Sequence, residues 1–81
     1  MAVIPETRYP CIDRQNAIEM AAHLTGDEGL EQVRVENNVV IVPCMDIRGA
    51  FQIAEHAAEN GWMTDHAAAG VVRQVEATLR R

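Results

Sequence analysis

The chain has 81 residues, with twelve acidic side chains against seven basic ones and a formal net charge of −5. A composition of 48% hydrophobic and 23% charged residues excludes a disordered chain, and the length allows one hydrophobic core. We therefore expect a single domain over residues 1–81. The acidic balance argues against direct binding to nucleic acid, because that affinity depends on Lys and Arg contacts with phosphates.

The longest apolar run in the middle of the chain, Val39 to Val42, ends at Pro43, so the sequence predicts no membrane span. The first residues lack the basic and apolar regions of a secretory signal, and we expect a cytoplasmic protein. The chain contains no serine, no glycine-rich phosphate loop and no HExxH motif. We accordingly expect a protein that is not an enzyme and that has no cofactor and no metal site.

Three helices are predicted from capping residues that precede apolar residues at helical spacing. Asp13 begins the first, over residues 13–25, and Asp46 begins the second, over residues 46–60. Thr64 begins the third, in which apolar side chains recur at i, i+3, i+4, i+7 and i+11. This spacing places one apolar stripe of the third helix against the core.

Between the first two helices the apolar period changes to that of a strand. Residues 33–36 alternate between valine and charged side chains, Asn37-Asn38 suits a tight turn, and residues 39–42 are all apolar. This pattern predicts a β-hairpin, and residues 2–4 are the candidate third strand beside it. The expected fold is a small α+β domain, an antiparallel hairpin or three-stranded sheet packed with three helices in the order (β)-α-β-β-α-α.

An offset of 33 residues aligns two segments of the chain. Pro10-Cys11-Ile12-Asp13 falls on Pro43-Cys44-Met45-Asp46, and in the helices that follow His23 falls on His56. The similarity is either a remnant of duplication or a chance match between two alanine-rich helices. A metal site shared by cysteine and histidine within one segment is excluded, because ten helical residues separate Asp13 from His23 and span about 15 Å.

The two thiols, Cys11 and Cys44, each lie two residues before a helix cap, where the helix dipole favours a thiolate. A redox or metal-responsive role for this pair is therefore one alternative function. The other interpretation is that both are buried, free cysteines that fill the junction between a strand and a helix.

The leading hypothesis follows from the uneven distribution of charge. Residues 27–65 carry eight acids against two arginines, whereas the third helix ends with an excess of arginine. We expect a non-enzymatic interaction module with an acidic surface that binds a basic protein partner. One form of this hypothesis is a phage-borne inhibitor of a nucleic-acid-binding machine, such as an anti-CRISPR protein. The expected partner-binding residues are Asp27, Glu28, Glu31, Glu36, Glu55 and Glu59.

Two further interpretations concern the second and third helices. Together they resemble a helix–turn–helix in outline, but the third begins with Thr64-Asp65-His66 and three alanines, which offer little to base edges or phosphates. On its outline alone, a helix–turn–helix regulator is the second alternative function. Small side chains on the third helix suit either close approach of another helix, as in a homodimer, or simply an exposed, helix-favouring surface. The expected dimer face consists of Trp62, Met63, His66, Gly70 and Arg73.

Overall fold

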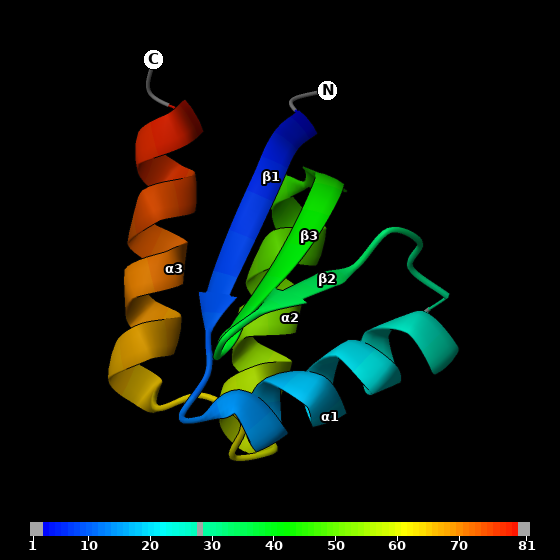
Figure 1. The fold of residues 1–81 in the computed structure, drawn as a ribbon. Helices are drawn as coiled ribbons and strands as arrows, with labels where there is room; N and C mark the ends of the chain where they lie inside the picture. The colour runs from blue at the N-terminus through cyan, green and yellow to red at the C-terminus, as the bar shows by residue number, and fades with distance from the viewer. Residues whose placement is uncertain (1–2, 28, 80–81) are drawn as a thin grey trace.

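The computed structural model describes residues 3–27 and 29–79, except for the side chains of Cys44 and Leu79. Within these residues, the chain forms a three-stranded sheet and three helices in the predicted α+β order, as Figure 1 shows. The elements are β1 (Val3–Pro10), α1 (Arg14–Gly26), β2 (Arg34–Glu36), β3 (Val39–Asp46), α2 (Ile47–Glu59) and α3 (Asp65–Leu79).

The sheet is antiparallel, with strand order β1-β3-β2, so the first strand of the chain pairs beside the second strand of the hairpin as expected. β1 pairs with β3 from Val3 opposite Asp46 to Pro10 opposite Val39. The expected third strand, residues 2–4, is longer than predicted, and its residue 2 lies outside the described residues. β1 contains proline and charged side chains, so its sequence lacks the apolar pattern by which a strand is recognised.

The predicted caps are present at the start of each helix. Asp13 accepts a hydrogen bond from the backbone N–H of Asn16 at 2.8 Å, and Asp46 accepts one from Gly49 at 2.6 Å. Thr64 Oγ1 accepts the N–H of Ala67 at 3.0 Å. Each cap satisfies a backbone donor that the first helical turn leaves without a partner.

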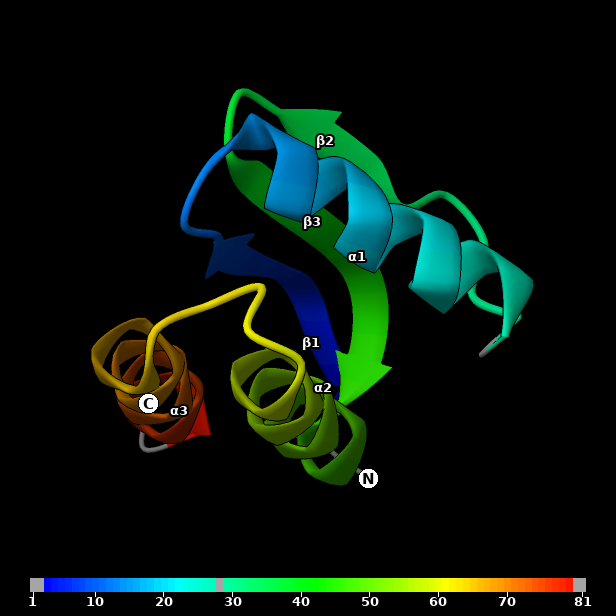
Figure 2. The ribbon, with the colours of Figure 1, turned by 90° about the horizontal axis from the view of Figure 1, so that it is seen from below.

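The helices and the inner side of the sheet enclose one core. α1 packs against β2 and β3, α2 packs against β1, β3 and α3, and α3 covers β1. Figure 2 shows α2 and α3 side by side, with α1 at the other end of the strongly curved β3. The largest fully buried side chains are those of Tyr9, Met20, Leu24, Val40, Ile41 and Val42.

Charged side chains cover the outer side of the sheet. Glu6 accepts hydrogen bonds from Arg8 at 3.1 Å and from Arg34 at 2.9 Å, which joins the two edge strands across β3. Ile41 pairs with both arginines in the strand register and is fully buried. Arginine stems can shield such an apolar residue while their charged ends remain in water.

The 33-residue offset also relates the two halves of the fold. α1 and α2 both have 13 residues, and their starts at Arg14 and Ile47 and their caps are all 33 residues apart. In the sheet, Arg8 pairs with its counterpart Ile41. In the described residues, no helix is sufficiently long and apolar to span a membrane.

Candidate functional site

The structure distributes the expected acidic residues over several elements. Asp27 follows α1, Glu31 lies in the loop before β2, Glu36 ends β2, and Glu55 and Glu59 lie on α2. All of these side chains are exposed. The remaining member of the set, Glu28, lies outside the described residues. The acids therefore do not belong to a single helix face.

Two groups of acids can be distinguished by their partners. Within the expected set, four exposed glutamates make no ion pair or hydrogen bond through their side chains in the described part of the chain: Glu31, Glu36, Glu55 and Glu59. Asp27, in contrast, forms a 2.7 Å ion pair with His23. Asp27 thus pairs within the chain, whereas the four glutamates can pair with basic side chains of another protein.

The expected dimer face is partly internal. Met63 is only 2% exposed and belongs to the core, so its assignment to an outer face was wrong. Trp62 is half-buried, and its ring contacts two histidines of the same chain. On α3, His66 and Arg73 are exposed, and a side chain at Gly70 would meet open space. The α3 part of this face is therefore accessible.

Cys11 has the environment of a core residue. It is 5% exposed, and its Sγ lies 3.6 Å from the carbonyl oxygen of Tyr9 and 3.7 Å from Met20 Sδ. Burial, together with the carboxylate of Asp13, raises the pKa of the Cys11 thiol to about 11. Of the two interpretations, the buried, free cysteine holds for Cys11, because burial and the capping carboxylate outweigh the helix dipole.

The strand register also separates the two cysteines. Cys11 follows the end of β1, whereas residue 44 of β3 lies between the partners of Ile4 and Glu6. Several residues of extended chain, at about 3.3 Å each, lie between these positions. A disulfide needs Cα atoms within about 7 Å, so this register excludes a bridge between Cys11 and Cys44.

A cluster that the sequence interpretation missed lies where the end of α1 meets α2. The Nε2 atoms of His23 and His56 are 3.2 Å apart, and their rings are stacked with centroids 4.9 Å apart. Trp62 packs against both rings, at centroid distances of 5.4 Å and 5.8 Å. The histidines are therefore a contacting pair rather than isolated surface residues.

The aspartate of this cluster orients one of its histidines. Asp27 Oδ2 lies 2.7 Å from Nδ1 of His23, one helical turn earlier. A carboxylate accepts at this distance, so His23 carries a proton on Nδ1 and, when neutral, turns the lone pair of Nε2 toward His56. The i,i+4 spacing was visible in the sequence, whereas the contact between the two histidines depends on helix packing.

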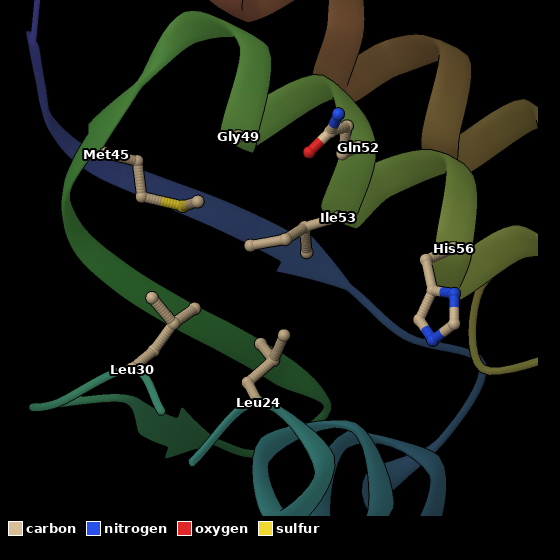
Figure 3. A pocket seen from close by; sticks show the side chains of 7 residues that line it. All are labelled: Leu24, Leu30, Met45, Gly49, Gln52, Ile53 and His56. Atoms are coloured by element: carbon tan, nitrogen blue, oxygen red, sulfur yellow. The ribbon is translucent and has the colours of Figure 1, made fainter. Parts of the chain in front are cut away.

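A pocket of about 280 Å³ opens beside His56. Figure 3 shows the His56 ring extending from α2 toward α1, with Leu24 and Leu30 across the opening. The lining is mainly apolar, and Gln52 provides a polar side chain. The lining residues are Leu24, Leu30, Met45, Gly49, Gln52, Ile53 and His56.

Within residues 3–27 and 29–79, no group of three or more His, Cys, Asp or Glu side chains is arranged to hold a metal ion. Comparison with known proteins finds no matching family model, no matching curated protein and no matching solved structure.

Proposed function

We propose that the protein is a non-enzymatic interaction module that binds a basic protein surface through Glu31, Glu36, Glu55 and Glu59. The observation that carries this proposal is that these exposed carboxylates have no partner within the described part of the chain. Free, exposed carboxylates can accelerate association with a basic partner and can discriminate among partners.

The arrangement of α2 supports the proposal further. Glu55 and Glu59 are four residues apart on this helix, so their side chains lie on the same face. Like charges at this spacing destabilise a helix by a few tenths of a kcal/mol. A basic partner would relieve this repulsion, which gives the glutamate pair a physical role in binding.

The test combines capture with charge reversal. A tagged chain is used to recover proteins from lysate of the source cells, and binding of the recovered proteins is measured for the double variant Glu55→Arg, Glu59→Arg. We expect affinity to fall about tenfold or more, mainly through slower association, and wild-type binding to weaken as salt rises.

The matched control is the double variant Glu19→Arg, Glu76→Arg, which makes the same change in net charge on α1 and α3. Its affinity is expected to stay closer to that of the wild type. Equal losses in the two double variants would show an effect of net charge alone. Binding that resists both salt and the α2 substitutions would overturn the proposal.

One specific form of this module is an inhibitor that occupies a phosphate-binding groove, as an anti-CRISPR protein of phage origin would. Acidic side chains can replace phosphates against Arg and Lys. In this form, the recovered partner binds nucleic acid, and the wild-type chain displaces duplex DNA or RNA from it while the α2 double variant does so less effectively. A partner that binds nucleic acid equally well in the presence of the chain contradicts this form.

A further inference from the structure

The two imidazoles of the cluster have a separation that suits two ligands of one ion. Two nitrogens, each about 2.1 Å from a tetrahedral ion, are about 3.4 Å apart. The Nε2 atoms of His23 and His56 are 3.2 Å apart. The ring centroids are only 4.9 Å apart, which is shorter than two imidazoles pointing head-on at each other would give. The line from each centroid through its Nε2 atom is therefore inclined to the line between the two nitrogens. Because each Nε2 lone pair follows its own inclined line, both lone pairs can point at one ion beside the line between the nitrogens.

Asp27 adds the interaction that usually accompanies a ligating histidine. Metal-bound histidines commonly donate their second ring N–H to a carboxylate, which holds the ring and its tautomer. Asp27 accepts from Nδ1 of His23 in this manner, at 2.7 Å. It does so at the C-cap of α1, where the helix dipole disfavours a negative charge. Pairing with His23 offsets this unfavourable position.

The pair is also reachable from solvent. The side chain of His23 is 24% exposed, and His56 lines the open 280 Å³ pocket. An ion at the two Nε2 atoms can therefore keep water molecules in its other coordination positions. Open positions are typical of metal sites that are not purely structural.

From this geometry we propose that His23 and His56 form a binding site for one divalent transition-metal ion, with Asp27 as a positioning residue. Imidazole ligands suit Zn²⁺ and Cu²⁺. Among the described residues, no third His, Cys, Asp or Glu joins the two histidines in a metal-binding group. Without the ion and with both rings neutral, the proton on Nδ1 of His23 makes the contact an N–H···N hydrogen bond in which His56 donates. On binding, His56 carries its proton on Nδ1 and offers the Nε2 lone pair instead.

The chain contains its own reporter for this site. Trp62 is the only tryptophan, and its ring lies within 5.8 Å of both imidazole centroids. We expect Cu²⁺ to quench its fluorescence with a stoichiometry of one ion per chain. Zn²⁺, whose filled d shell does not quench, should compete with Cu²⁺ and restore the signal.

The variants His23→Gln and His56→Gln are each expected to raise the half-saturating Cu²⁺ concentration about tenfold or more. His66→Gln is the matched control, because it removes an exposed histidine of α3, and its titration should follow that of the wild type. Quenching that persists in both site variants, that is lost equally in His66→Gln, or that Zn²⁺ does not reverse would overturn the proposal.

A measurement on the unaltered chain removes any dependence on the folding of these variants. Electron paramagnetic resonance of the chain with equimolar Cu²⁺ should show hyperfine coupling to two imidazole nitrogens. Asp27→Asn should weaken binding by about tenfold without changing this nitrogen count, as expected for a positioning residue. A spectrum without imidazole coupling contradicts the site. The acidic interface uses other residues, so either proposal can fail without the other.

Discussion

The thiol of Cys11 is an internal packing group with a suppressed tendency to ionise. Its pKa rises to about 11 because burial and the Asp13 carboxylate both disfavour the thiolate. The proton is held more tightly in the folded chain than in the unfolded chain, whose thiol has an ordinary pKa near 9.0. The raised pKa therefore adds to the free energy of unfolding. This contribution is fully present below about pH 9 and is lost as the pH rises through about 11.

We expect this burial to make Cys11 unreactive at neutral pH. In a Cys44→Ala background, the reaction of Cys11 with a disulfide reagent at pH 8 should be about 100-fold slower in the folded chain than in urea, because the thiolate fraction falls about tenfold per pKa unit. The free energy of unfolding, measured by urea titration, should also decrease between pH 9 and 11. Cys11→Ala in the same background is the control for the pH effect. Equal reaction rates with and without urea would contradict the buried thiol.

Residue-level predictions from sequence were reliable where the cause is local. The caps at Asp13, Asp46 and Thr64 were all confirmed, because a capping bond depends only on the next few residues. The His23–His56 contact joins residues 33 positions apart and requires the packed helices. In the sequence, the offset that aligns His23 with His56 was the one signal that connected these two residues.

At the scale of the elements, strand length was the least predictable property. β3 continues through Pro43 to Asp46, although proline was expected to end it. β2 pairs only with residues 39–41, so the later part of β3 has one free edge, where a residue without an N–H can lie. β1 lacked a continuous apolar pattern because its outer side carries Glu6 and Arg8.

Helix α3 gives a prediction that separates backbone freedom from packing. Gly70 lies inside this helix, and a Cβ there would meet nothing within 4 Å. Gly70→Ala should therefore raise the free energy of unfolding by roughly 0.5–1 kcal/mol, through lower backbone entropy in the unfolded chain. Urea titration measures this change.

The matched substitution is Gly61→Ala. Its Cβ would also meet open space, but Gly61 has a φ of +77°, which alanine adopts poorly. We expect it to be destabilising, opposite in sign to Gly70→Ala. If Gly70→Ala instead lowers stability in a manner that depends on protein concentration, α3 packs closely against a second chain, as the expected dimer face requires. A destabilisation that is independent of concentration would contradict the open environment of Gly70.

At the scale of the whole molecule, α3 completes the core that the sheet, α1 and α2 begin. Val71 and Val75 of this helix are each 3% exposed, and α3 packs on both β1 and α2. β1 is an edge strand, and an uncovered edge promotes pairing with other chains. The predicted apolar stripe of α3 is confirmed at these valines, which places the third helix within the one core of the chain.

If the chain unfolds as one cooperative unit, a substitution that disrupts the packing of α3 on β1 and α2 should destabilise the whole fold. Val75→Asp buries an unpaired carboxylate and should cost about 3 kcal/mol or more, a large part of the stability of a domain this small. Gln74→Asp adds the same charge at the exposed neighbouring position and should change stability by no more than about 0.5 kcal/mol. Far-ultraviolet circular dichroism and Trp62 fluorescence should give coincident urea transitions in every variant. Loss of α3 signal alone, with the remaining elements still folded, would show that residues 1–81 do not unfold as a single domain.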